Sequence, residues 1–157
     1  MVPPNHLSNL THILTQMRVF HYILAGDITE MFLQIRLHPD DRPCHRFTHR
    51  GPHYQWTRAL FGNKASPNMS QKVLHTLCIQ EENLDQAKET VSRSCYMDDC
   101  INSWDSIQEI TELARQLPRL LSQAGMKICK IYSNCREALE EVPPNLRPPE
   151  SISRTGT

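Results

Sequence analysis

Tyr96-Met97-Asp98-Asp99-Cys100 carries the strongest structural and chemical signal in this chain of 157 residues. Neighbouring side chains on a regular strand point to opposite faces, so two adjacent carboxylates can serve one site only where the backbone turns sharply. The stretch therefore predicts a tight hairpin with both carboxylates at its tip. Such a tip suits Mg²⁺, which prefers oxygen ligands and assists phosphoryl transfer as one or two ions. An isolated Asp-Asp pair is more often a solvated loop or a helix N-terminus, so the interpretation needs support from elsewhere in the chain.

A third carboxylate ends an apolar run near the N-terminus. Residues 19–27 read Val-Phe-His-Tyr-Ile-Leu-Ala-Gly-Asp, and Asp27 precedes Asp98 by 71 residues. β-branched and aromatic residues in a short run of this kind predict a buried strand, and a strand end is a common position for a catalytic side chain. The intervening chain is long enough to bring the three carboxylates together.

Four segments in a fixed order resemble the motifs of retroelement reverse transcriptases. Gly26–His38 resembles their first carboxylate motif, Ala59–Pro67 resembles their Phe-Gly…Ser-Pro motif, and Tyr96–Asp99 matches their hairpin motif. Gly125–Asn134 is similar to the segment that grips the primer. The resemblance extends over roughly residues 5–142. The motif sequences around Asp27 and near Ser133-Asn134 are most similar to those of Bel/Pao-type LTR retrotransposons.

The resemblance implies an α+β fold: a polymerase palm, with an antiparallel sheet, helices packed on one face and part of the fingers. No thumb, connection or ribonuclease H sequence is expected within the chain. We assign residues 1–142 to the palm with partial fingers. Residues 143–157 are rich in Pro and Ser, with few large apolar side chains, so we expect a disordered tail.

The resemblance also implies a catalytic set for two-metal nucleotidyl transfer. Asp27, Asp98 and Asp99 correspond to the catalytic and metal-binding carboxylates, and the backbone carbonyl of Ile28 to a further metal ligand. The expected cofactor is a pair of Mg²⁺ ions, for which Mn²⁺ can substitute. Three carboxylates within a few ångström repel one another, so the site should be strained when empty. An exposed turn residue is the alternative for Asp99.

Further positions match residues that contact the substrates in this family. The expected nucleotide-binding residues are Phe32, Phe61, Gly62 and Met97. The expected template-binding and primer-binding residues are Tyr96, Lys64, Gln71 and Lys130. The Phe32 ring would clash with a 2′-hydroxyl and so select deoxynucleotides. Simpler alternatives stay open: Phe32 as core, Gly62 as a turn glycine and Gln71 on a helix surface.

Composition sets broad limits on the function. The net charge is zero, yet residues 36–72 hold seven Lys/Arg against two Asp, and residues 81–112 hold two Lys/Arg against nine Asp/Glu. A basic segment beside an acidic one suits a polyanion next to bound cations, although two solvated faces give the same pattern. The six cysteines are expected to be reduced, as in a cytosolic protein. No apolar run approaches the ~20 residues of a membrane-spanning helix.

Local patterns predict the order of the elements. A first helix is expected at residues 6–17, and a second begins at Ser66 with the apolar face Met69, Val73 and Leu77. A third helix follows a capping box formed by Ser106 and Glu109 and ends at Gly125. Its buried stripe is expected to be Ile110, Leu113, Leu117 and Leu121. Strands are expected at residues 33–37, within 45–58, in a hairpin at 91–101 and at 126–132.

Three hypotheses follow. The first is a reverse transcriptase domain of a retrotransposon polyprotein, with an RNA or DNA template-primer and dNTPs as partners. The second is a catalytically inactive relic of that lineage, with at most weak binding of nucleic acid or metal. The third is an unrelated binding module with an accidental Asp-Asp pair. The expected location is the cytoplasm, within a virus-like particle or with access to the nucleus. The oligomeric state is left open.

Overall fold

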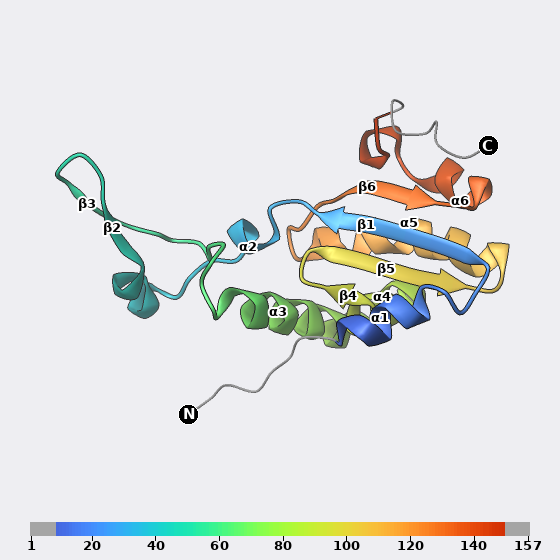
Figure 1. Cartoon of the computed structure of the whole chain (residues 1–157), viewed down its shortest axis with the longest axis horizontal. Coiled ribbons are helices and arrows are strands. Elements are labelled where there is room, and N and C mark those ends of the chain that lie inside the picture. Colours follow the sequence, from blue (N-terminus) through green and yellow to red (C-terminus); the bar gives the residue numbers. More distant parts are fainter. Residues whose placement is uncertain (1–8, 150–157) are drawn as a thin grey trace.

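A four-stranded antiparallel sheet forms the centre of the computed structural model, which describes residues 9–149 (Figure 1). The strand order is β4-β5-β1-β6. The strands are β1 (Tyr22–Ile28), β4 (Cys95–Tyr96), β5 (Asp99–Trp104) and β6 (Ile128–Ser133). The antiparallel sheet agrees with the prediction, and it places β1, from the N-terminal part of the chain, between β5 and β6 from the later part.

Two helices cover one face of the sheet, and the other face is open at the end that carries Asp27, while α1 (Leu10–Gln16) contacts β4 and β5. In β1, the buried residues Leu24, Gly26 and Ile28 alternate with half-buried ones, as the two-residue period of a strand requires. Helices α4 (Asp85–Arg93) and α5 (Ile107–Gln123) lie behind the sheet in Figure 1 and contact its strands. The side chains of β1 that point to the other face include Asp27.

Helix α5 forms as the sequence predicts. Ser106 is its N-cap: the hydroxyl accepts a hydrogen bond from the Glu109 backbone N–H at 3.1 Å and donates one to the Glu109 carboxylate at 2.9 Å. Gly125 follows the helix with a φ of +70°, a conformation that glycine adopts without steric cost. The predicted apolar stripe is fully buried at Ile110, Leu113, Leu117 and Leu121.

The remaining elements connect and flank the sheet. Helices α1 (Leu10–Gln16), α2 (Met31–Gln34), α3 (Ser66–Gln80) and α6 (Arg136–Glu141) accompany two 3-10 helices, η1 (Pro39–His45) and η2 (Pro144–Leu146), and two short strands, β2 (Arg46–Thr48) and β3 (His53–Gln55). The β2–β3 hairpin, within the predicted strand region 45–58, projects away from the sheet (Figure 1). Part of the basic segment of the sequence, including Arg46 and Arg50, therefore lies on this extension.

The strand predicted at residues 33–37 is wrong in its first half. Leu33 belongs to α2, and only Arg36 forms an isolated antiparallel bridge, with Arg58. The Leu37 backbone N–H donates to the Thr57 carbonyl at 2.9 Å, which extends this contact. Apolar alternation over five residues is too short to exclude a single helical turn.

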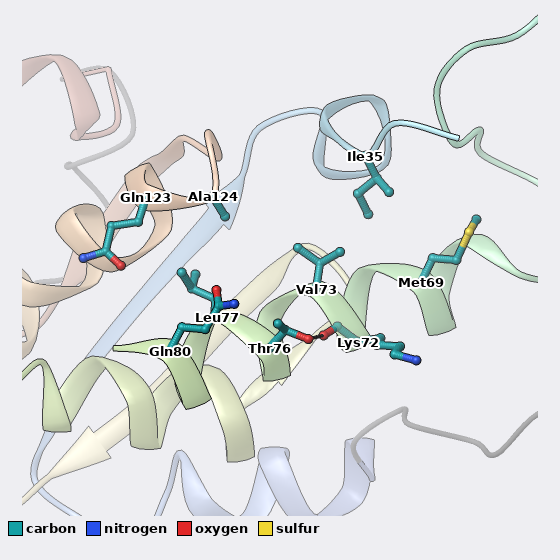
Figure 2. A pocket seen from close by; sticks show the side chains of 9 residues that line it. All are labelled: Ile35, Met69, Lys72, Val73, Thr76, Leu77, Gln80, Gln123 and Ala124. Atoms are coloured by element: carbon teal, nitrogen blue, oxygen red, sulfur yellow. Dashed lines mark hydrogen bonds between the residues drawn. The ribbon is translucent and has the colours of Figure 1, made fainter. Parts of the chain in front are cut away.

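Helix α3 begins at Ser66, as predicted, but its core-facing side differs from the predicted one. Leu74, Leu77 and Cys78 are buried, whereas Met69 and Val73 are only half-buried. Met69 and Val73 face a hollow of about 450 Å³ between α3 and the end of α5 (Figure 2). The buried stripe is displaced by one position along the helix, an offset that a 3.6-residue period permits when apolar residues are scattered.

Other boundaries moved by a few residues. The hairpin predicted at 91–101 starts later, because residues 91–93 are the last turn of α4. Of the predicted helix 6–17, residues 6–8 lie outside the described residues. The predicted tail begins with η2, where the Arg147 guanidinium donates to the Val142 carbonyl at 2.8 Å, and residues 150–157 lie outside the described part. No helix within residues 9–149 is long and apolar enough to cross a membrane.

Gly26 gives a first prediction, because β1 and β6 approach closely there. A Cβ atom on Gly26 would lie 2.6 Å from Ile128 Cδ1 and 2.9 Å from Ile128 Cγ1. We expect Gly26→Ala to lower the free energy of unfolding by about 1–3 kcal/mol, the usual cost of overpacking a core. Urea denaturation measures the change.

Ile128→Val supplies the control for this prediction, since it removes the Cδ1 atom that a Cβ on Gly26 would meet first. In a double-mutant cycle the combined variant should be less destabilised than the sum of the two single variants. Strict additivity would contradict the steric explanation.

Candidate active site

The register of the sheet brings the three predicted carboxylate residues to one end of it. Asp27 of β1 pairs directly with Asp99 of β5. The Ile28 backbone N–H donates to the Asp98 carbonyl at 2.7 Å, which fixes the turn before β5 against the end of β1. Residues separated by 71 positions in the sequence are thereby held as neighbours, as the sequence predicts. This is also the end from which the chain leaves toward the β2–β3 hairpin (Figure 1).

Met97 and Asp98 form a two-residue turn, because Tyr96 pairs with Asp99 on either side of them. Met97 has a φ of +54°, in the left-handed region. A non-glycine residue pays roughly 1 kcal/mol or more for this conformation, which persists only when the surrounding structure imposes it. The predicted tight hairpin is therefore present, with Asp98 in the turn and Asp99 as the first residue of β5.

A disulfide joins the two strands of this hairpin directly behind the turn. Cys95 and Cys100 are cross-strand partners, fully buried, and their sulfurs are bonded. The prediction of reduced thiols is wrong for this pair, because the two-residue turn sets the two side chains side by side. The remaining cysteines, Cys44, Cys78, Cys129 and Cys135, are free.

The Asp27 carboxylate already has a cationic neighbour. Lys130 Nζ lies 3.1 Å from Asp27 Oδ2, and Cys129 Sγ lies 3.9 Å from the same oxygen. The pair borders a hollow of about 210 Å³ on the open face of the sheet. Its lining residues are Ala25, Gly26, Asp27, Asp99, Ile101, Lys130 and Tyr132. The predicted set had included Lys130 but not Ala25, Ile101 or Tyr132, whose positions depend on the sheet register.

The donor chemistry of this cluster fits a divalent cation, since three carboxylates supply the hard oxygen ligands that Mg²⁺ prefers. The arrangement of the side chains fits less well. Within residues 9–149, no group of three or more His, Cys, Asp or Glu side chains is disposed to hold a metal ion. The ion pair with Lys130 occupies one Asp27 oxygen. The three aspartates therefore lie at the same end of the sheet, but their side chains are not arranged to bind one metal ion.

The charges of the cluster act on the carboxyl pKa of Asp99. Burial raises the pKa of its carboxyl above the ordinary value, and repulsion from Asp98 and then from Asp27 raises it further, while Lys130 lowers it. The expected mutual repulsion of the three carboxylates is thus present. Because the folded state holds the Asp99 proton more tightly than the unfolded chain does, this carboxyl favours folding at low pH. That contribution is lost as the pH rises through the raised pKa.

Asp99→Asn should therefore stabilise the metal-free protein at pH 7, where the wild-type carboxylate is charged and repelled. We expect a rise in Tm of less than about 5 °C, since the group keeps partial access to solvent. The difference between variant and wild type should shrink as the pH falls toward about 4, the ordinary pKa of an aspartate. Thermal melts followed by circular dichroism across pH 4–7 measure it. A lower Tm for the variant at pH 7 would contradict the repulsion.

Two of the predicted nucleotide-binding residues contact each other: Phe32 belongs to α2, and Phe61 lies in the segment before α3. Phe32 is 6% exposed and belongs to a small cluster with Leu37 and Ala59. Its ring meets Phe61 edge-on at 4.9 Å between centroids, and Phe61 is 62% exposed. The neighbouring Gly62 has a φ of +83°, in the left-handed region. A Cβ atom added to Gly62 would have no contact within 4 Å. Phe32 is thus largely a core residue, while Phe61 and Gly62 offer an open surface.

The other predicted contacts differ in their surroundings. Lys64 is exposed in the loop before α3, and Tyr96 is half-buried beside the turn. Gln71 is not on the helix surface: it is 6% exposed, and its side-chain nitrogen has no hydrogen-bond partner among the described residues. A buried amide in this condition can still donate a hydrogen bond.

Ser133 and Asn134, at the end of the predicted primer-gripping segment, are engaged within the fold. The Ser133 hydroxyl donates to the Ile23 carbonyl at 2.6 Å. The Asn134 side chain accepts from the Ile23 N–H and donates to the His21 carbonyl, both at 2.8 Å. These bonds fasten β6 to the start of β1, at the end of the sheet opposite Asp27. In this structure the pair therefore stabilises the sheet.

The structure thus combines an antiparallel sheet with Asp98 and Asp99 at a strained hairpin, next to Asp27 on the neighbouring strand. The model of the family "Reverse transcriptase (RNA-dependent DNA polymerase)" matches residues 2–131. The chain belongs to the reverse transcriptase family.

Two further comparisons agree with this assignment. The chain is 26% identical over 125 residues to the genome polyprotein of Petunia vein clearing virus, covering 80% of this chain and 5% of the polyprotein. Among solved structures, it resembles the foamy viral protease-reverse transcriptase in complex with an RNA/DNA hybrid, with a TM-score of 0.64 and 21% identity. A form of that viral protein with double-stranded DNA gives a TM-score of 0.65, also at 21% identity.

The chain spans a small part of these relatives. The match to the foamy viral chain bound to the RNA/DNA hybrid includes 81% of this chain but only 16% of the viral one. The match to the chain bound to double-stranded DNA includes 82% of this chain and 21% of the viral one. The structural likeness supports the palm fold. The activity of the whole viral proteins is a property of much longer chains.

Proposed function

We propose that this chain is the palm segment of an RNA-directed DNA polymerase, which transfers a nucleotide from a dNTP to a primer 3′-hydroxyl. The observation that carries the proposal is the direct pairing of Asp27 with Asp99 beside the Met97–Asp98 turn. Membership in the reverse transcriptase family supports the same reaction. The substrates expected in this role are an RNA or DNA template-primer and dNTPs.

In this role Asp27, Asp98 and Asp99 would hold two Mg²⁺ ions, with the Ile28 carbonyl as a further ligand. When bound, such ions would supply a lower pKa for the primer hydroxyl and stabilisation of negative charge during the transfer. The chain's own residues supply the positioning. The β1–β5 register fixes Asp27 against Asp99, and the bond from Ile28 N–H to the Asp98 carbonyl fixes the turn.

The remaining site residues surround this centre in the proposal. Phe61, Gly62 and Met97 line the nucleotide position, with Phe32 beneath the sugar, where its ring excludes a 2′-hydroxyl. Tyr96 and Lys130 lie near the primer end. Lys64 contacts phosphate, and Gln71, whose side-chain nitrogen has no hydrogen-bond partner among residues 9–149, lies on the template side.

We further propose that the segment derives from a Bel/Pao-type LTR retrotransposon polyprotein and acts in the cytoplasm, within a virus-like particle. The similarity to a viral genome polyprotein supports an origin in a polyprotein. The amino-acid sequence of the motif at residues 26–38 supports the Bel/Pao assignment.

The second candidate is a catalytically inactive relic that keeps the palm fold. One observation favours it: no metal-ligand grouping occurs within residues 9–149, and Asp27 is engaged by Lys130. Under this alternative the chain binds metal or nucleic acid weakly and does not extend a primer.

A primer-extension assay separates the two candidates. The purified chain is incubated with a DNA primer on an RNA template, all four dNTPs and Mg²⁺, and the products are resolved on a sequencing gel. Template-dependent extension that stops on chelation and resumes on adding Mg²⁺ supports the polymerase. Absence of extension, with both Mg²⁺ and Mn²⁺ and on RNA and DNA templates, contradicts polymerase activity of this chain and leaves the relic.

A further inference from the structure

Lys130 occupies an irregular position in β6. Its φ of +50° is in the left-handed region, which a lysine rarely adopts within a strand. The β1–β6 register shifts at the same place: Ala25 pairs with Tyr132, but Asp27 pairs with Cys129. One extra residue therefore lies in β6 opposite Gly26, which is the definition of a β-bulge. Bulges of this kind redirect a side chain without ending the strand.

The bulge places the Lys130 side chain on the open face, at Asp27. The Nζ–Oδ2 distance is 3.1 Å, and the hydrogen bond and attraction from Asp27 raise the pKa of the lysine. Lys130 also acts on Asp99, whose carboxyl pKa it lowers against the effects of burial, Asp98 and Asp27. The ammonium group thus partly neutralises the carboxylate cluster from one side.

We propose that Lys130 is a built-in counter-cation of the carboxylate cluster, which a divalent ion must displace from Asp27 before that carboxylate becomes a ligand. The inference rests on the proposed metal-binding function and adds a regulator of metal affinity to it. It also accounts for the lack of ligand geometry in the described residues, because the position beside the Asp27 oxygen is already taken by a positive charge.

Competition between Lys130 and a metal ion for Asp27 should lower the metal affinity of the site. A divalent ion at Asp27 and an ammonium group a few ångström away repel each other, so bound metal requires Lys130 to move into solvent. Lys130 is 61% exposed and can do so, which limits the penalty. Removing the charge should therefore tighten metal binding, whereas a residue that merely supports the fold would leave the affinity unchanged or reduce it.

Manganese titration tests the proposal with a readout other than activity. Free Mn²⁺ is measured by its electron paramagnetic resonance signal as it is added to the wild type, Lys130→Met and Lys127→Met. Methionine keeps an unbranched apolar side chain and removes the charge. Lys127 is the matched control, since it is an exposed lysine close to the start of β6 and has no ion pair with a carboxylate among residues 9–149. Circular dichroism confirms that all three proteins are folded.

We expect Lys130→Met to bind Mn²⁺ about three- to tenfold more tightly than the wild type, and Lys127→Met to match the wild type within about twofold. Wild-type binding with an unchanged or weaker affinity in Lys130→Met overturns the counter-cation while leaving the proposed metal site intact. A lack of binding in both proteins overturns the metal site itself and the counter-cation with it. Equal tightening in both lysine variants points to general surface charge and also overturns the inference.

Discussion

Asp98→Asn should reduce primer extension by at least about 10²-fold while leaving the fold intact. The substitution keeps the shape of the side chain and the backbone carbonyl that accepts from Ile28 N–H, but it removes a negative charge from the proposed metal site. Loss of one group that stabilises charge in a transition state typically costs 10²–10³ in rate. The measurement is the initial rate of extension on an RNA template with Mg²⁺.

Asp105→Asn is the matched control for this prediction. Asp105 follows β5 at its other end, where it is exposed and its carboxylate is hydrogen-bonded to His21 Nδ1 at 2.9 Å. Its substitution removes the same charge at a position remote from Asp27, so extension should stay within about twofold of the wild type. Extension by Asp98→Asn at the wild-type rate would show that the hairpin carboxylates do not perform the reaction.

Local physics made much of this structure predictable. The tight hairpin that carries Asp98 and Asp99 follows from adjacent carboxylates that must serve one site, although only Asp98 lies in the turn itself. The Ser106 cap and the four-residue stripe of α5 follow from hydrogen bonding and helical period within 20 residues. The β2–β3 hairpin follows from residues 51–52, Gly-Pro, between two short extended segments. In each case the decisive interactions join residues that are close together in the sequence.

Features that depend on contacts between distant elements were not predictable in the same way. The bulge at Lys130 exists because β6 must follow β1 while skipping one residue, and no local pattern in residues 126–133 indicates it. The Cys95–Cys100 bond follows from the register across the turn, although the spacing of four residues around Met97–Asp98 could have suggested it. The buried face of α3 likewise depends on where the helix meets the sheet.

The same distinction applies to the site. The sequence identified Asp27, Asp98 and Asp99, and the structure gathers them. It did not identify the ion pair that Lys130 makes with Asp27, because the resemblance assigned that lysine to the primer. A carboxylate cluster is stable without metal only if its charge is relieved, and the relief here comes from Lys130 on the neighbouring strand β6, 103 residues after Asp27 in the sequence.

Leu117→Ala should cause a large loss of stability, about 2–5 kcal/mol in the free energy of unfolding. Leu117 is fully buried in the cluster between α5 and the sheet, so truncation removes apolar contacts and leaves a cavity. Because domains of this size are stable by only about 5–15 kcal/mol, the change removes a large share of the total. Urea denaturation followed by circular dichroism at 222 nm measures it.

Ile107→Ala, at the exposed start of the same helix, is the control and should cost less than about 1 kcal/mol, since Ile107 is 40% exposed. The comparison matters for the site, because α5 contacts β1 and β5, the strands that hold Asp27 against Asp99. A destabilised α5 should therefore weaken Mn²⁺ binding before the chain unfolds globally. If Leu117→Ala and Ile107→Ala had equal effects on unfolding, α5 would not be the support on which the carboxylate register depends.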